Sequence, residues 1–289
     1  MKIFVAVLSI GLLGIVGVAN SQSFYSYRGG RDVIVSLGTG TSSYFGDLKD
    51  PGDYIDAKPN INLGAQYFFN PRLSTRIELN WFQLNGDDSD AEAEGRVVRN
   101  LSFSSNNYEV SIVGILNAFP NGRRFYQRPQ FNLYGFLGVG GLYFNPKAEL
   151  NGKKYALQPL ATEGVEYSRF TFVVPFGAGV KYKVGPFFNI ALEGGYRLTF
   201  TDYLDDVSTN YVDNSSFTNP TAAALADRRP EIGLPKLEAG HIRGNPDKND
   251  GYFLFNLKIE FYLPPNVYSI NSQNRKIKGP RRNIQRRRR

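Results

Sequence analysis

Polar and apolar residues alternate with a period of two along much of the chain. In residues 170–182, every even-numbered position is apolar, and the odd-numbered positions include Thr171, Gly177, Gly179 and Lys181. Successive side chains of a strand point to opposite faces, so this period predicts strands with one apolar and one polar face. Eight segments show the pattern, namely residues 32–39, 60–69, 73–81, 107–116, 131–144, 170–182, 188–199 and 252–262.

The connections between these segments are alternately short and long. Asn70-Pro71 and Gly185-Pro186 are tight turns, and a short connection containing Pro120-Asn-Gly122 joins the fourth and fifth segments. The long connections are residues 40–59, 85–105, 145–168 and 201–250. Outer-membrane barrels have short periplasmic turns and long outer loops, whereas a soluble sandwich has no reason for this asymmetry. We therefore predict an all-β fold, a transmembrane antiparallel up-and-down β-barrel of about eight strands with long extracellular loops.

The polar faces of these segments carry as many basic as acidic side chains. The basic ones are Arg76, Lys181, Arg197 and Lys258, and the acidic ones are Glu78, Glu109, Glu193 and Glu260. Eight strands enclose a space that side chains can fill. We therefore expect paired charges inside the barrel rather than an open pore. Aromatic residues near strand ends are expected at the membrane interface, namely Tyr67, Phe69, Trp81, Tyr196 and Tyr262.

The first residues have the pattern of an export signal. Lys2 precedes a run from Ile3 to Val18 that is apolar apart from Ser9, and Ala19-Asn20-Ser21 offers small residues for cleavage before Gln22. A transmembrane helix is the competing interpretation, but the run is shorter than the roughly 20 residues that a span needs. The absence of cysteine excludes disulfides and a lipoprotein anchor. The predicted domains are a signal peptide at 1–21, a barrel at 22–263 and a polybasic, disordered periplasmic tail at 264–289.

The net charge of +8 is concentrated in this tail. Residues 275–289 contain nine basic and no acidic residues, so +8 minus 9 leaves −1 for the rest of the chain. An exported protein meets little nucleic acid, so no nucleic-acid partner is expected. The tail suits an acidic partner or anionic lipid headgroups, or it is a solvated end without a partner. Its candidate docking residues are Arg281, Arg282, Arg286, Arg287, Arg288 and Arg289.

The loops contain few residues with catalytic or metal-binding chemistry. His241 is the only histidine, and no nucleophile motif accompanies it. Acidic clusters at 87–94 and 202–206 could bind calcium or the bridging cations of lipopolysaccharide, but neither has EF-hand spacing, and acidic outer loops are commonly solvated. Gly138-Val-Gly-Gly141 looks like a phosphate loop but lies within a predicted strand. We predict no catalytic residues, no cofactor and no bound metal.

Several stretches resemble one family. They are Ser43-Tyr-Phe-Gly-Asp-Leu48, Leu160-Ala-Thr-Glu-Gly164, Val174-Pro-Phe-Gly-Ala-Gly-Val-Lys181 and Phe200-Thr-Asp-Tyr-Leu-Asp-Asp-Val-Ser-Thr-Asn-Tyr211. Together they look like the PorG-type outer-membrane barrels of the Bacteroidota, including a related family of unknown function. The stretch from Phe200 to Tyr211 is the most specific. The candidate binding residues taken from these stretches are Thr162, Glu163, Thr201, Asp202, Tyr203, Asp205 and Asp206.

The resemblance implies a structural component of the type IX protein secretion machinery in the cell outer membrane. Such a barrel would be surrounded by outer-membrane lipid and would dock a periplasmic ring made of a lipoprotein and its soluble partner. Both chain termini would be periplasmic. The family carries no catalytic residues, so none are expected here. The alternative is a small barrel for adhesion, envelope integrity or passive transport.

Overall fold

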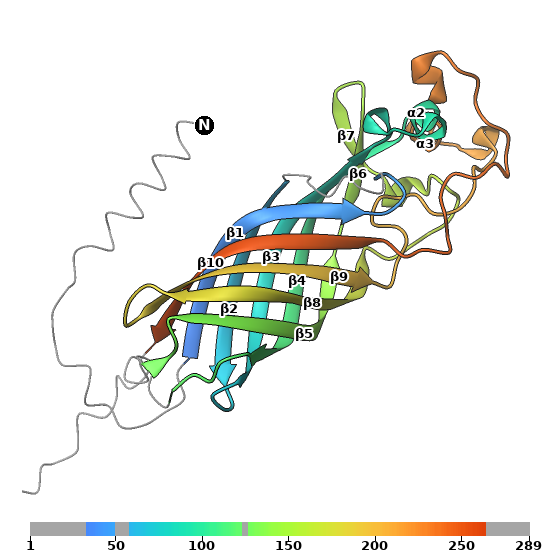
Figure 1. Ribbon diagram of the computed structural model, residues 1–289. Coiled ribbons are helices and arrows are strands. Elements are labelled where there is room, and N and C mark those ends of the chain that lie inside the picture. Colours follow the sequence, from blue (N-terminus) through green and yellow to red (C-terminus); the bar gives the residue numbers. More distant parts are fainter. Residues whose placement is uncertain (1–32, 50–57, 123–126, 264–289) are drawn as a thin grey trace, which may run out of the picture. The chain divides into compact units, whose positions relative to one another are not determined.

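A computed structural model describes residues 33–49, 58–122 and 127–263, all within the unit Arg31–Arg289. The predicted signal peptide and polybasic tail lie outside these residues. The barrel strands are β1 Val33–Phe45, β2 Lys58–Phe68, β3 Leu73–Asp87, β4 Ser102–Asn117, β5 Phe131–Tyr143, β8 Phe170–Lys183, β9 Phe188–Thr199 and β10 Gly251–Leu263. Neighbouring strands are antiparallel. Because β3 pairs with β4, and β1 pairs with both β2 and β10, the sheet closes on itself (Figure 1).

All eight predicted strands are confirmed, but several run further than their patterns suggested. β1 continues to Phe45, β3 continues to Asp87, and β4 already begins at Ser102. The inner faces of these extensions carry apolar side chains such as Leu84 and Phe103, both buried. The extensions persist because a hydrophobic core covers them at this end.

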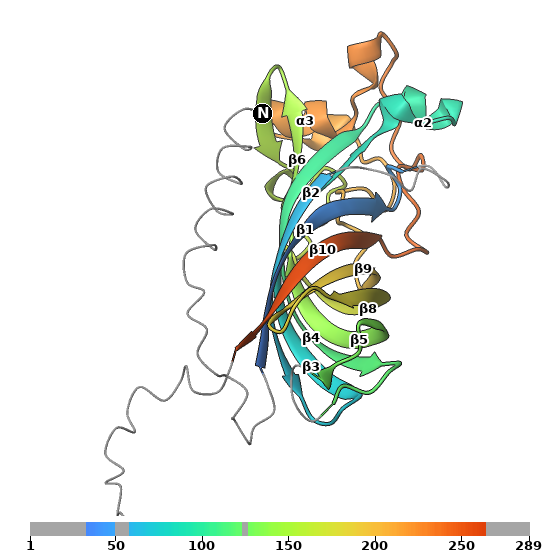
Figure 2. The same cartoon turned by 60° about the vertical axis from the view of Figure 1, so that its left-hand side comes forward.

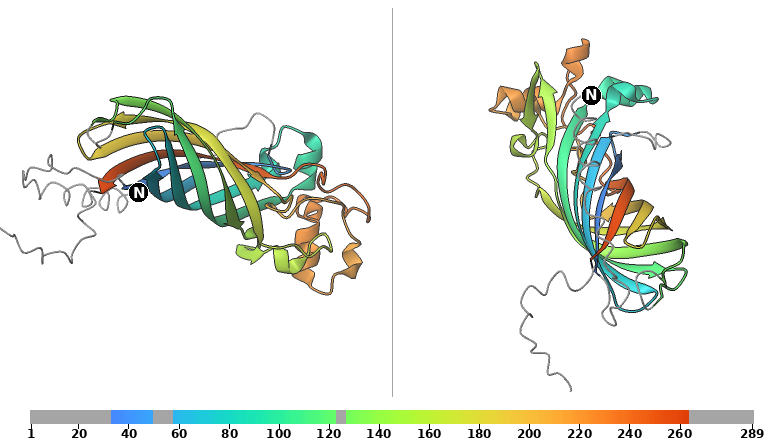
Figure 3. Two further views of the ribbon diagram at one scale, coloured as in Figure 1. Left: turned by 90° about the horizontal axis from the view of Figure 1, so that it is seen from below. Right: turned by 90° about the vertical axis from the view of Figure 1, so that its left-hand side faces the viewer.

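The two ends of the barrel differ. The three short connections lie at one end, here named the turn end, and the long ones gather at the other (Figures 1 and 2). We name residues 46–49, 88–101, 144–169 and 200–250 the cap. Expected only as loops, these segments contain η2 Asp88–Asp90, α2 Glu94–Arg99, β6 Pro146–Leu150, β7 Lys153–Ala156, η4 Gln158–Leu160, η5 Asn214–Ser216, α3 Pro220–Ala226 and η6 Arg229–Ile232. Figure 3 shows them beyond the strand ends. None of the helices in the described residues is long and apolar enough to cross a membrane.

The outer face of the barrel is apolar. Its exposed side chains include Leu37, Leu79, Ile112, Leu137, Val139 and Phe172. A closed barrel with this outer surface is the architecture of outer-membrane proteins. Tyr67 and Phe69 lie on this face as predicted, but the prediction for Tyr262 was wrong. Tyr262 shares the inward parity of Lys258, is buried, and packs its ring 4.5 Å from the Arg128 guanidinium carbon.

The inner face carries the predicted charges, and none of the eight is more than 7% exposed. Lys258 Nζ lies 2.6 Å from both Glu78 Oε1 and Glu193 Oε1. Arg76 contacts the same two carboxylates at 2.8 and 2.6 Å. The remaining pairs are Lys181–Glu260 at 2.6 Å and Arg197–Glu109 at 3.4 Å. The expectation of an ion-paired interior is confirmed.

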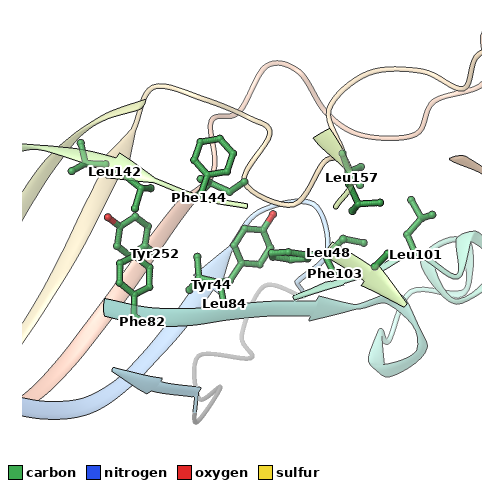
Figure 4. Close-up of a cluster of buried hydrophobic side chains, with 14 of the residues drawn as sticks. Tyr44, Leu48, Phe82, Leu84, Leu101, Phe103, Leu142, Phe144, Leu157 and Tyr252 are labelled. Carbon is green, nitrogen blue, oxygen red and sulfur yellow. The ribbon is translucent and has the colours of Figure 1, made fainter. Parts of the chain in front are cut away.

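Towards the cap, the interior becomes apolar. Phe82 and Tyr252 stack with ring centroids 4.7 Å apart, and Tyr44 meets Phe103 edge to face at 5.0 Å (Figure 4). Side chains from the loops, including Leu48 and Leu157, complete this cluster.

Within β5, a Cβ on Gly138 would lie 2.2 Å from the Ile112 carbonyl oxygen. That glycine therefore relieves crowding between strands, as expected for a glycine-rich stretch within a strand.

Candidate functional site

Three of the family-like stretches meet in the cap. Residues 43–48 leave the end of β1, residues 160–164 follow η4, and residues 200–211 follow β9. They are far apart in sequence, yet hydrogen bonds join all three around one buried polar cluster. We name this cluster the cap knot, formed by Tyr44, Thr162, Glu163, Tyr167, Asp202, Tyr203, Asp205, Asp206, Arg243 and Asp250.

Glu163 is the most highly bonded side chain of the cap knot. Its carboxylate accepts hydrogen bonds from Ser208 N at 3.0 Å, from Thr209 N at 2.9 Å and from Thr209 Oγ1 at 2.7 Å. Arg243 donates another at 2.8 Å. Although burial opposes ionisation, the Arg243 charge and the Ser208 N–H hold the pKa of Glu163 below its usual value. Glu163 therefore fastens two loops together as a carboxylate.

Asp206 also joins the loop after η4 to the loop after β9. It accepts hydrogen bonds from Thr162 Oγ1 and, at 2.6 Å, from the Tyr167 hydroxyl. Its backbone is left-handed, with a φ of 71°, a conformation that is unusual for residues other than glycine. Burial raises the pKa of Asp206 to about 6, although the Arg243 charge opposes the rise. The ring of Tyr167 stacks on Tyr203 with centroids 4.6 Å apart.

The stretch around Tyr44 is explained by its contacts with the cap. The Tyr44 hydroxyl lies 2.6 Å from Asp205 Oδ2 and 2.8 Å from Asp250 Oδ1. A Cβ on Gly46 would lie 1.9 Å from that hydroxyl and from Asp250 Oδ1, so any other residue there would have to displace these buried groups. Asp47 accepts a hydrogen bond from Asn245 N at 2.7 Å, and Leu48 is in the hydrophobic cluster.

Asp202 differs from its neighbours because neither of its buried side-chain oxygens has a hydrogen-bond partner of regular geometry, although the nearby Ser208 side chain opposes the rise in its pKa. Burial, together with the negative charges of Asp47 and Glu163, raises its pKa to about 7. Asp202 is therefore a protonated carboxyl over much of the acidic range. The described residues contain no group of three metal-ligating side chains that could hold an ion.

The structure brings the predicted binding residues together but gives most of them internal partners. Thr162, Glu163, Asp202, Asp205 and Asp206 are all buried, while Thr201 and Tyr203 are half-buried. Apart from Asp202, they bind one another or the loop backbone, so they act first as structural contacts. A role in binding an external ligand stays a prediction. The docking residues of the tail lie outside the described residues.

Sequence reasoning missed several members of the cluster. Arg243 lies two residues after His241, whose side chain is exposed. No local motif marks Arg243 or Asp250, because each is defined by its contacts with residues far along the chain.

The first acidic cluster lies outside the cap knot. Its Asp88 binds Arg99 at 2.7 Å and Arg96 at 3.2 Å. Its carboxylate is therefore paired with arginines.

The comparison with protein families matches residues 25–221 to the family described as "Domain of unknown function (DUF6089)". The match covers more than half of the chain. This chain belongs to that family. The DUF6089 match contains the strands from β1 to β9 and all three stretches of the cap knot, and it ends before Arg243, Asp250 and β10.

No curated protein matches this DUF6089 chain. Among solved structures, Ail of Yersinia pestis has a TM-score of 0.40 and 14% identity, over 81% of this chain and 99% of Ail. Neisserial surface protein A has a TM-score of 0.40 and 10% identity, over 81% of this chain and 99% of that one. OprG of Pseudomonas aeruginosa has a TM-score of 0.40 and 11% identity, over 82% and 97%. Similarities this distant carry no argument about function, and the absence of enzymatic activity stays a prediction.

Proposed function

We propose that this protein is a structural, non-conducting barrel of the outer membrane that holds other envelope components in place. The observation that supports the proposal best is the filled interior. Arg76, Lys258, Glu78 and Glu193 occupy the space between the strands, and the hydrophobic cluster and cap occupy the space beyond them. A barrel without a water-filled path is poorly suited to transport, which favours a role in which its position in the membrane matters.

The specific role that we propose is in the type IX secretion machinery, where the barrel would anchor a periplasmic ring of a lipoprotein and its soluble partner. The resemblance to PorG-type barrels supports this role, and three of the four stretches that carry it contribute residues to the cap knot. Val33 pairs with Leu263 at the turn end, so the segments before β1 and after β10 both continue from that end. With the turn end in the periplasm, the polybasic tail would lie on the same side of the membrane as the ring. It would bind an acidic surface of the ring through electrostatic attraction, which added salt weakens.

Gene deletion tests the secretion role. Export of type IX cargo should fail in the deletion strain and recover when the full chain is restored. A chain that ends at Leu263 should still insert, but it should recover less of the ring in affinity purifications at low salt. If that shortened chain retains full ring recovery and secretion, the tail has no docking role. Normal cargo export in the deletion strain would remove the secretion role and leave only the barrel.

The orientation can be tested separately, because the chain has no cysteine of its own. Ser89 is exposed in the cap and Arg72 is exposed in a turn at the other end. With the turn end in the periplasm, a membrane-impermeant thiol reagent should label Ser89→Cys on intact cells and should label Arg72→Cys only after lysis. The reverse pattern would contradict the orientation.

A further inference from the structure

Two buried carboxyl groups of the cap knot meet at one hydroxyl. Tyr44 Oη lies 2.6 Å from Asp205 Oδ2 and 2.8 Å from Asp250 Oδ1. Tyr44, Asp205 and Asp250 are 0%, 1% and 2% exposed. No bulk water can therefore separate the three groups, and both contacts have hydrogen-bond length.

The other oxygen of each carboxyl binds the loop that follows β9. Asp205 Oδ1 accepts a hydrogen bond from Val207 N at 2.9 Å, and Asp250 Oδ2 accepts one from Leu204 N at 2.9 Å. The backbone N–H of Asp250 donates to the Thr201 carbonyl at 3.1 Å. The pair therefore joins the end of β1, the loop after β9 and the residue before β10.

The two contacts of the Tyr44 hydroxyl require a proton on one of the two carboxyls. The Tyr44 hydroxyl has one hydrogen, so it can donate to one carboxyl only. If both carboxyls were ionised, the second contact would place two oxygens at hydrogen-bond distance with no proton between them. A proton on one carboxyl resolves this, because that carboxyl donates to Tyr44 Oη while Tyr44 donates to the other. We propose that Asp205 and Asp250 share one proton through Tyr44, and that this proton latches the cap onto the barrel.

The charged groups around the pair do not replace the proton. Asp47 and Arg99 act on Asp205, while Asp202 and Tyr196 lie near Asp250. Arg99 already binds both oxygens of Asp88 and the carbonyls of Asp47 and Arg243. Burial raises the pKa of both Asp205 and Asp250 well above the usual range, and for Asp250 the negative charges of Asp205 and Asp202 add to the rise.

The sign of the pH effect follows from proton linkage. In an opened cap both carboxyls are hydrated and ionise near their ordinary pKa of about 3.9. At neutral pH this pair therefore holds one more proton in the closed form than in the open form, so rising pH favours opening. A difference of one proton changes the opening equilibrium by up to about tenfold per pH unit.

Asp205→Asn tests the latch because an amide reproduces the protonated carboxyl. Its oxygen can accept from Val207 N–H while its amide nitrogen donates to Tyr44 Oη. Hydrogen exchange of the Leu204 and Val207 amides should be followed from pH 6 to 9 in lipid nanodiscs and corrected for the intrinsic exchange rate. The opening of the wild type should increase with pH more steeply than that of Asp205→Asn. Asp88→Asn is the control, since it should loosen the cap at every pH without changing the slope. Equal slopes in the wild type and Asp205→Asn would overturn the proposal.

Infrared spectroscopy tests the proton directly and does not depend on opening. Asp202 and Asp206 have pKa values of about 7 and 6, so the spectra are compared at pH 8 in proteins that also carry Asp202→Asn. There the protein with Asp205 and Asp250 intact should show a protonated carboxyl C=O band that is lost on adding Asp205→Asn and also on adding Asp250→Asn. The band should persist in Asp88→Asn, whose carboxylate is paired with arginines in the wild type. If neither Asp205→Asn nor Asp250→Asn removes such a band, both carboxyls are ionised and the latch does not exist.

Discussion

Lys258 is the centre of the charge network inside the barrel. Its side chain has no exposed surface, and its ammonium lies between two carboxylates that also bind Arg76. Transfer of these charges from water is costly, and their mutual attraction offsets the cost only while every partner is present. The network is therefore sensitive to the loss of any one member.

Lys258→Met should lower the free energy of unfolding by about 3–5 kcal/mol, because two buried carboxylates would then share Arg76 alone. Reversible urea unfolding in lipid vesicles measures the loss. Lys154→Met removes an exposed lysine of β7 and should change stability by less than about 0.5 kcal/mol. Similar losses in the two variants would show that the interior pairs contribute no more than a surface charge.

Asp202 should make the cap less stable as pH rises. Its pKa is about 7 in the folded protein, while in an unfolded chain it ionises near 3.8. Between these values the folded state retains a proton that the unfolded state has lost, so stability falls from about pH 4 to pH 7. Asp202→Asn should flatten this part of the profile, as measured by the melting temperature of the cap at several pH values. An unchanged profile would mean that Asp202 is already ionised when the protein is folded.

For single residues, the sequence predicted which charged side chains point into the barrel, but it did not predict the contacts between residues of the cap. Strict alternation decides which face Glu193 or Lys258 occupies, since a strand has only two faces. No such rule relates Glu163 to Arg243, which are joined only when two long loops pack together. Three of the family-like stretches lie in loops that meet at the cap knot, but their sequences did not show that these residues bind one another.

The strands themselves followed the sequence pattern closely, and the elements of the cap did not. One local signal was nevertheless present. Asn151-Gly152 has positive φ angles of 53° and 77° and forms the turn between β6 and β7. This dipeptide is the strongest short hairpin signal when strands flank it. It was missed because β7 has only four residues and both of its lysines are exposed, so the alternation is absent.

The cost of an outward-facing charge should depend on how deep its position lies in the membrane. Leu257 is outward and 48% exposed near the middle of the strand. Leu257→Arg should cost about 2–4 kcal/mol of stability, because the charge would lie in the hydrocarbon layer. Val184→Arg, in the turn between β8 and β9, should cost no more than about 1 kcal/mol. Equal costs, measured by unfolding in lipid, would contradict the depth that we assign to Leu257.

The whole barrel is closed in two ways, by the ion pairs between its strands and by the cap with its hydrophobic cluster. Purified protein in planar lipid bilayers should therefore show no stable conductance of porin size. A chain in which residues 201–249 are replaced by a short turn should also remain non-conducting, because the charge network lies below the cap. Steady large channels from folded monomers of the full chain would show that the interior is open.

The pairing of β1 with β10 has a consequence for how the protein can be divided. Every residue from Val33 to Phe45 has a partner between Gly251 and Leu263, so the seam joins the first and last described strands. The DUF6089 match ends at residue 221, before the second side of that seam. A recombinant fragment trimmed to the match would leave the edges of β1 and β9 without partners, and bilayer lipid cannot satisfy their backbone groups. Such a fragment should aggregate through its open edges. A fragment that is to fold into a closed barrel must therefore extend to Leu263.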